Sequence, residues 1–181
     1  MTYLATDHII EGLEAGEPPR LARFLPIFHG SERERRRLSL STDINNWLTS
    51  TVSSDFLTKL KAAVAVHLGQ FIKGEEIDDD IFMKRVSDRR RGHHEFAHEV
   101  WAMRPEFNPK YRFFGAFFRA DWFVVLRKDT RDNLKNDRQW HAQIDATCQS
   151  WGLLFPYTPR HSGNDFAEYV TFNAEHYDER W

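Results

Sequence analysis

Cysteine is almost absent from this sequence: Cys148 is the single one among 181 residues. One thiol cannot form a disulfide within the chain, so the fold must be stabilised by a hydrophobic core rather than by covalent cross-links. Cysteine usage of this kind is typical of proteins from reducing compartments. We therefore expect a cytoplasmic protein.

Long hydrophobic runs and an excess of one charge are absent as well. No apolar stretch is long enough to cross a bilayer, and the acidic residues 1–20 lack the hydrophobic segment of a signal peptide, so we expect no membrane association. Lys and Arg number 25 against 27 Asp and Glu, which gives a net charge of -2. Without a global basic field, a nucleic acid would have to be held by a local patch. We also find no internal repeat, P-loop or dinucleotide-binding fingerprint.

Aromatic residues, in contrast, are plentiful, with 15 Phe and 6 Trp, and hydrophobic residues make up 41 % of the chain. Burial of so many apolar side chains can offset the conformational entropy lost on folding. The composition therefore predicts a globular fold. We divide the chain into an N-terminal arm, residues 1–52, and an α+β domain with a C-terminal helical tail, residues 53–181.

The arm is interrupted by prolines and is expected to have little structure of its own. Apolar residues at helical spacing after Pro18 and Pro19 predict a short helix over 21–28. Alternating residues over 38–42 predict a brief edge strand. The run of mixed charges over 32–37 predicts an exposed helical face.

Two amphipathic helices are expected in the domain. Apolar residues recur at helical spacing over 55–73, and Gly74 suits the end of that helix. A second helix is expected from about residue 138 to residue 151, with Asn136 or Asp137 as its cap. A short last helix should follow a capping box at 162–165.

Four strands should form an antiparallel sheet flanked by these helices. They are expected over 81–86, 99–104, 111–119 and 122–128. Only Ala120 and Asp121 separate the last two, which predicts a tight hairpin. Both faces of these two strands are apolar, so we expect the sheet to be covered on both sides. Gly115 in mid-strand indicates a bulge or a close backbone approach.

One short motif points to a different chemistry. Residues 94–98 read His94-Glu95-Phe96-Ala97-His98, an H-E-x-x-H. In zinc proteases one helix places two such histidines on one face, and the glutamate activates a metal-bound water. Here Trp101 and Arg104 stand where one protease class requires Gly and a third His, and residues 100–103 predict a strand. We therefore prefer a polar loop, with zinc binding by the two histidines as an alternative.

The order of elements resembles that of the RelE/ParE/HigB superfamily of small toxins. The likeness covers about residues 53–155, and four segments carry it: IFMKRV, EVWAMR, YRFFGAFF and WFVVLRK. They are similar to the superfamily's Lys-rich strand start, its strand ending in Leu-Arg, its Tyr-Arg strand and its strand ending in basic residues. Ribosome-dependent members of that superfamily cleave messenger RNA, and ParE-type members act on gyrase. The resemblance therefore implies an RNA-cleaving or translation-targeting domain.

The resemblance also implies a set of site residues. Arg104 and Arg127 match basic positions used by the RNA-cleaving members, and Arg112 is either catalytic or structural. The C-terminal helix brings Trp140 and His141 where some members place an aromatic or acid/base residue. Expected binding positions are Lys84, Arg85 and Lys128. Cations of this kind hold phosphate and stabilise developing negative charge, while a group such as His141 assists proton transfer at the 2′-hydroxyl.

Three functions are therefore compatible with the sequence. The first is a toxin-like protein whose partners are RNA or the ribosome and an antitoxin-like protein. The second is a non-catalytic interaction protein of phage or plasmid origin, which binds partners through its arm and C-terminal tail and forms a complex or homodimer that depends on residues 1–52. The third is a zinc hydrolase. No cofactor is expected for the first two, and zinc is expected for the third.

Overall fold

The computed structural model describes residues 3–27, 32–77, 82–90 and 98–171, over which four α-helices and six strands form. In chain order they are α1 (Tyr3–Ala15), β1 (Leu21–Arg23), β2 (Arg37–Ser41), α2 (Thr42–Thr49), α3 (Asp55–Lys73), β3 (Met83–Arg85), β4 (Trp101–Met103), β5 (Tyr111–Arg119), β6 (Trp122–Thr130) and α4 (Asp137–Leu154). Two short 3-10 helices, η1 (Arg131–Asn133) and η2 (Phe166–Glu168), follow β6 and α4. The fold class is α+β, as expected.

The strands form one mixed sheet in the order β1-β2-β6-β5-β4-β3. The four expected strands, β3 to β6, pair antiparallel with one another. β2 runs parallel to β6, and β1 is antiparallel to β2. The expectation of a four-stranded antiparallel sheet is therefore incomplete, because the arm adds two strands, one of them in parallel pairing. β2, expected at an edge, lies between β1 and β6.

The arm is built into the fold, contrary to the expectation of little structure. α1 precedes the prolines, and residues 21–23 form a strand in place of the expected helix over 21–28. Leu21 is fully buried and pairs with β2, whereas Leu25 and Ile27 are 59 % and 77 % exposed. The apolar residues of this stretch do not share one buried face, so pairing with β2 decides its conformation.

The run of mixed charges over 32–37 is not an exposed helical face. Arg36 is fully buried, and Arg37 begins β2. The backbone N–H groups of Arg35 and Arg36 donate to the Ile72 carbonyl at 2.8 and 3.0 Å, which ties the run to the end of α3. Tertiary packing, which local charge patterning does not reveal, determines this conformation.

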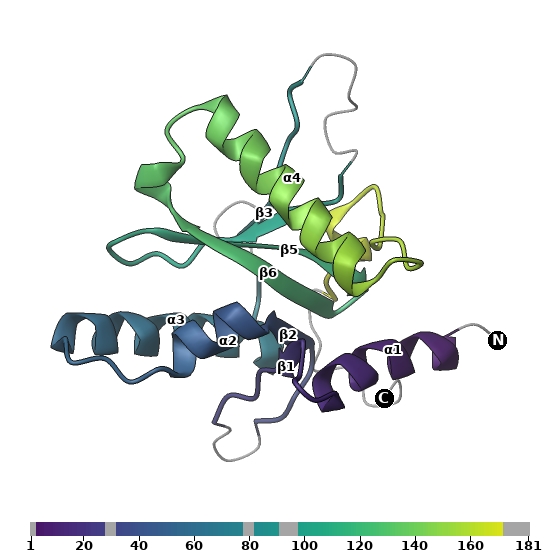
Figure 1. The fold of residues 1–181 in the computed structure, drawn as a ribbon, viewed down its shortest axis with the longest axis horizontal. Helices are drawn as coiled ribbons and strands as arrows, with labels where there is room; N and C mark the ends of the chain where they lie inside the picture. The colour runs from purple at the N-terminus through teal and green to yellow at the C-terminus, as the bar shows by residue number, and fades with distance from the viewer. Residues whose placement is uncertain (1–2, 28–31, 78–81, 91–97, 172–181) are drawn as a thin grey trace.

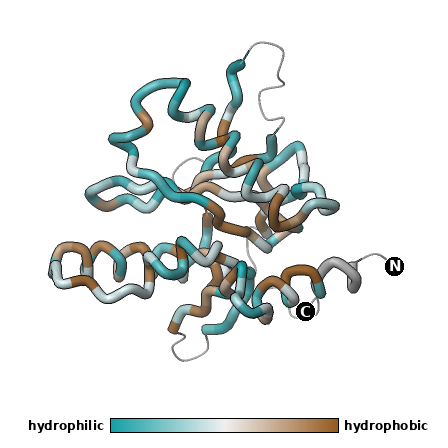
Figure 2. The backbone as a smooth tube through the Cα atoms, in the orientation of Figure 1, coloured by the Kyte–Doolittle hydropathy of each residue, from teal (hydrophilic) through white to brown (hydrophobic). Residues whose placement is uncertain are grey.

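Hydrophobic side chains cover both faces of the sheet, as the apolar strands predict. α2 and α3 lie on one face, where Val64 and Phe71 join the main core, and Figure 1 shows α4 on the opposite side of the strands. Ile10 of α1 and Trp151 of α4 pack together on that second face. Ile144 extends the cover over β4 and β5. Figure 2 shows hydrophobic residues gathered along the sheet and more hydrophilic ones in the first turns of α4.

The long hairpin of β5 and β6 matches its prediction, except that β6 continues two residues further, to Thr130. Its turn includes Asp121, which adopts a positive φ of 60°. The register shifts between Phe114 and Gly115, so the predicted bulge is present. A Cβ atom on Gly115 would lie 2.0 Å from the Val124 carbonyl oxygen, which only glycine avoids.

Capping residues set the ends of α3 and α4, and Gly74 and Asn136 do so as expected. The Ser54 side chain accepts a hydrogen bond at the start of α3, and Gly74 ends that helix with a left-handed φ of 80°. Asn136 begins α4 in a capping box. The expected last helix is reduced to η2. Its N-cap is Asp165, whose side chain makes no capping hydrogen bond, so the capping box expected at 162–165 is not formed. Within the described ranges, no helix is long and apolar enough to span a membrane.

Candidate anion-binding cleft

A cleft of about 550 Å³ opens between β3, β4 and β5 and the first turns of α4. We call it the arginine cleft, because six of its lining residues are cationic. They are Lys84, Arg85, Arg89, Arg104, Arg112 and Arg131. Asp137 is the one carboxylate among the described lining residues, and Trp140 and His141 belong to the same wall. Since the whole chain has a net charge of -2, this positive field is local.

Strand alternation brings three of these cations to one face of the sheet. Ala102 of β4 and Phe114 of β5 face α4, whereas their sequence neighbours join the core beneath α2 and α3. Arg104 and Arg112 lie two positions from them and therefore share the α4 face. Lys84 pairs with Ala102 across the ladder, which places it on that face too.

Arg112 is the most buried cation of the cleft, at 7 % exposure. One of its Nη1–H groups donates to the Tyr111 carbonyl oxygen at 2.8 Å. Burial lowers the pKa of Arg112 first, and the positive charges of Arg104 and Arg131 lower it further, against an opposing effect of Glu106. A guanidinium among like charges is stabilised by an anion that approaches them together.

Arg131 and Trp140 form the part of the cleft next to the start of α4. The Arg131 guanidinium donates to the Leu134 carbonyl and lies 5.7 Å from the centre of the Trp140 ring. Phe114 contacts the same ring edge to face, with centroids 5.7 Å apart. The α4 N-terminus, capped by Asn136, adds the positive end of its helix dipole. This region therefore offers a half-buried aromatic ring beside positive charge.

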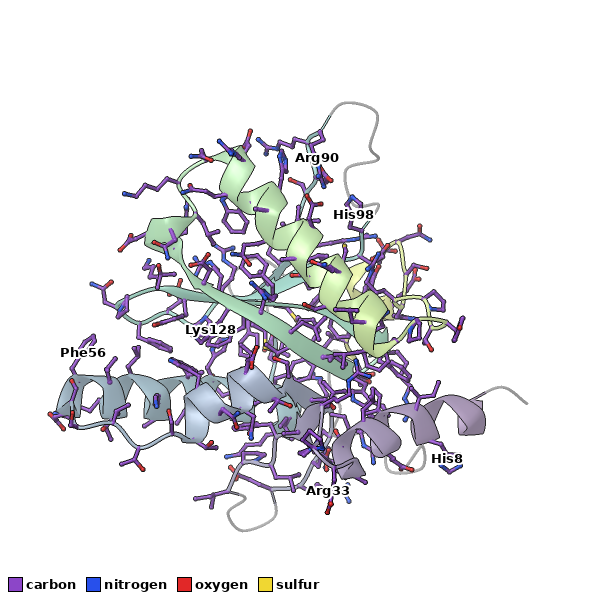
Figure 3. All side chains as sticks on the ribbon, in the orientation of Figure 1. His8, Arg33, Phe56, Arg90, His98 and Lys128 are labelled. Atoms are coloured by element: carbon purple, nitrogen blue, oxygen red, sulfur yellow. The ribbon has the colours of Figure 1, made fainter. Side chains whose placement is uncertain are left out.

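His141 joins the cleft to a buried carboxylate behind it. Its Nε2 lies 3.6 Å from Oδ1 of Asp88, whose side chain is 1 % exposed. His98 Nε2 lies 2.9 Å from the other oxygen of Asp88. Figure 3 shows Arg90 and His98 on the same side of the sheet as α4. The imidazole of His141 thus has a fixed neighbour as well as access to the cleft.

Arg85 lines the cleft, but its guanidinium is engaged in the fold. It is hydrogen bonded to the Glu99 carboxylate and donates to the Gly163 carbonyl oxygen at 3.2 Å. The Tyr169 hydroxyl donates to the same carboxylate at 2.6 Å. Burial and this bond to Glu99 raise the pKa of Tyr169 to about 12. Arg85 therefore fastens the chain around residue 163 to β3, which is a structural role.

Two expected residues, Arg127 and Lys128, do not line the cleft. Lys128 Nζ lies 4.7 Å from the centre of the Trp47 ring, and Figure 3 shows this lysine between β6 and the helices on the opposite side of the sheet from His98. Burial lowers the pKa of Lys128. Arg127 is an exposed residue of β6. The structure thus brings Lys84, Arg85, Arg104, Arg112 and His141 together and leaves these two apart.

The H-E-x-x-H motif falls mostly outside the described residues, which exclude His94 and Glu95. The strand expected after it is confirmed, because residues 101–103 form β4 between β3 and β5. His98 is described, and its imidazole contacts Asp88. No group of three or more metal-ligating side chains occurs in the part of the chain that the structure describes. Zinc binding by the motif stays a prediction.

Asp88 and Arg131 are the site residues that the sequence did not reveal. Arg131 follows β6 in a stretch of alternating charges that is typical of a solvated turn. Asp88 precedes an arginine run, and its Oδ1 accepts from the backbone N–H of Arg90 at 3.0 Å, a local turn that an Asp at this position favours. The sequence could have indicated this turn. It could not have indicated that α4 approaches Asp88, because that is a tertiary contact.

Comparison with known proteins gives no match: no family model fits the chain, and no curated protein or solved structure is significantly similar to it.

Proposed function

We propose that the arginine cleft binds the phosphodiester backbone of RNA and that the chain is an RNA-cleaving domain of the toxin type. The convergence of Arg104, Arg112 and His141 in one cleft carries this proposal. Guanidinium groups bind phosphate oxygens through paired N–H donors. Imidazole transfers protons near neutral pH. A cleft with both groups suits an RNA phosphate and its neighbouring 2′-hydroxyl.

In the proposed reaction the 2′-oxygen attacks the adjacent phosphorus, and the bond from phosphorus to the 5′-oxygen breaks. The products are a 2′,3′-cyclic phosphate and a 5′-hydroxyl. His141 accepts the proton of the 2′-hydroxyl, while the leaving 5′-oxygen takes a proton from water. The resulting hydroxide is neutralised by the imidazolium, which restores neutral His141. Arg104 and Arg112 stabilise the negative charge that grows on the phosphate oxygens.

Trp140 and Arg131 favour a single-stranded substrate. A half-buried aromatic ring beside cations can stack a base that is not paired in a duplex, which contributes about 1–3 kcal/mol per base. The ring is held by Phe114 and Arg131, so it needs little ordering when a base arrives. This arrangement fits a messenger RNA segment better than a duplex.

The proposal is tested by incubating the purified chain with single-stranded RNA, with and without ribosomes, and analysing the product ends. Arg104→Ala and His141→Ala should each lower the cleavage rate by about 100-fold or more, because each removes a group that acts in the transition state. Lys59→Ala is the matched control: Lys59 is a 77 % exposed lysine on α3, paired with Asp55. It should cleave at the wild-type rate.

Growth of cells that express the same variants is a second measurement. The wild-type chain should arrest growth, and Arg104→Ala and His141→Ala should relieve the arrest. Absence of cleavage in both reactions, or cleavage that survives both substitutions, contradicts the proposal. A 2′-deoxy residue at the cleaved position should block the reaction, because it removes the attacking oxygen.

A further inference from the structure

Asp88 is a buried carboxylate that faces three side chains carrying nitrogen. Its side chain is 1 % exposed. Asp88 lies three residues after the end of β3, outside any helix or strand. Arg90 Nε donates to both of its oxygens at 2.9 Å. His98 Nε2 lies 2.9 Å from one oxygen, and His141 Nε2 lies 3.6 Å from the other. A carboxylate this buried remains in the fold because such partners offset its desolvation.

The contact with His141 has a chemical consequence for the cleft. The Asp88 oxygen lies 3.6 Å from Nε2, beyond hydrogen-bond distance, so its negative charge favours electrostatically the tautomer that carries its proton on Nε2. Nδ1 of the same ring then keeps its lone pair and is the atom able to accept a proton. A carboxylate behind a histidine also stabilises the imidazolium that forms when the proton is taken.

We propose that Asp88 is a positioning residue, which holds the His141 ring with Nε2 protonated and so leaves Nδ1 as the proton acceptor of the arginine cleft. The catalytic part of this inference rests on the proposed RNA cleavage, whereas the arrangement of Asp88 and His141 does not. Asp88 does not line the cleft, so it acts through His141 and not on RNA.

Arg90 supplies the control that separates positioning from simple anchoring. Its guanidinium is held by Asp88 on one side and by Asp145 of α4 on the other, at 2.8 and 2.9 Å. Hydrogen bonds to both carboxylates raise the pKa of Arg90. Asp145 thus shares the anchoring contact of Asp88, but the described contacts of Asp145 include no histidine. Asp145→Asn weakens the anchor and spares His141.

The tautomer of His141 is measured by nitrogen-15 NMR of the full chain at a pH where the ring is neutral, with His141→Gln used to assign the signals. The wild-type spectrum should show a proton fixed on Nε2. Asp88→Asn should shift the ring toward a mixture of tautomers, and Asp145→Asn should leave it unchanged. The wild-type spectrum decides the geometry even if Asp88→Asn fails to fold: a proton mainly on Nδ1 overturns the inference.

Steady-state cleavage adds the functional reading. Asp88→Asn should lower kcat by about 10-fold or more, because oriented proton transfer is lost, while KM stays within about twofold because the cations that hold phosphate are untouched. Asp145→Asn should retain kcat. A fall in kcat that is equal in both variants, or an unchanged kcat in Asp88→Asn, overturns the positioning role. If the tautomer behaves as expected but wild type cleaves no RNA, the proposed function fails and the geometry of Asp88 and His141 stands.

Discussion

Arg36 and Arg112 show two uses of a buried guanidinium in one chain. Arg36 donates to backbone carbonyl oxygens of two separate segments, at Phe71 and Glu75 around the end of α3 and at Thr171. Its Nε lies 3.4 Å from Asp121, and burial lowers its pKa to about 10 against the opposing effect of that carboxylate. Arg112 instead has other cations as neighbours. The first side chain is held by acceptors within the fold, whereas the second lies where an external anion would be stabilised.

Replacement of Arg36 should therefore reduce stability strongly. Arg36→Met fills much of the space but leaves three carbonyl oxygens without their guanidinium donor and the Asp121 carboxylate without its positive neighbour. We expect a loss of about 3 kcal/mol or more in the free energy of unfolding, measured by urea denaturation. Arg33→Met, at an exposed position of the same run, should cost less than about 1 kcal/mol. Equal losses in the two variants contradict the structural role.

At the scale of elements, local pattern identified some segments and failed for others. α3, α4 and the β5–β6 hairpin were predictable because their periodicity, caps and turn residues all favour the same structure. β1 has three residues, and its strand conformation depends on pairing with β2, which arrives later in the chain. Such long-range pairing leaves little trace in a window of ten residues, so the sequence indicated a helix there.

The bulge in β5 constrains the sheet, because the backbones of β5 and β6 approach closely at Gly115. Gly115→Ala would place a methyl group against the Val124 carbonyl, so one strand must shift. We expect a loss of about 2 kcal/mol or more in the free energy of unfolding, as for overpacked or strained core sites, measured by thermal or urea unfolding.

Gly152→Ala is the control for that substitution. Gly152 lies in α4 with open space around its Cβ position, and alanine in a helix should raise stability by up to about 1 kcal/mol. If Gly115→Ala is as well tolerated as Gly152→Ala, the close approach of β5 and β6 is wrong.

At the scale of the whole molecule, one sheet unites the arm with the rest of the chain.

The candidate site was predictable only in part, because some of its residues meet through contacts between segments that are distant in the sequence. The resemblance indicated Arg104, Arg112 and His141, because each lies on a strand or helix that the sequence predicts. Asp88 and Arg131 join them through the packing of α4 across the sheet, which no local pattern encodes.

The two isoleucines of α1 test whether the arm belongs to the core. Ile10 is fully buried against the sheet, whereas its neighbour Ile9 is 39 % exposed. Ile10→Ala should lower the free energy of unfolding by about 2–4 kcal/mol, because it leaves a cavity in the core. Ile9→Ala should change it by less than about 1 kcal/mol. A cooperative unfolding transition that Ile10→Ala leaves unchanged indicates a detached arm.

The proposal that the arginine cleft binds RNA is tested most directly by the salt dependence of binding to a labelled single-stranded RNA whose 2′-O-methyl groups prevent cleavage. Arg104→Gln and Arg131→Gln should each weaken binding and lower the slope of log Kd against log salt by about 0.7, because each removes one phosphate contact. Lys59→Gln, on the opposite face, should change neither quantity. A slope that falls equally for Lys59→Gln and Arg131→Gln, or no measurable RNA binding by the wild-type chain, contradicts the account.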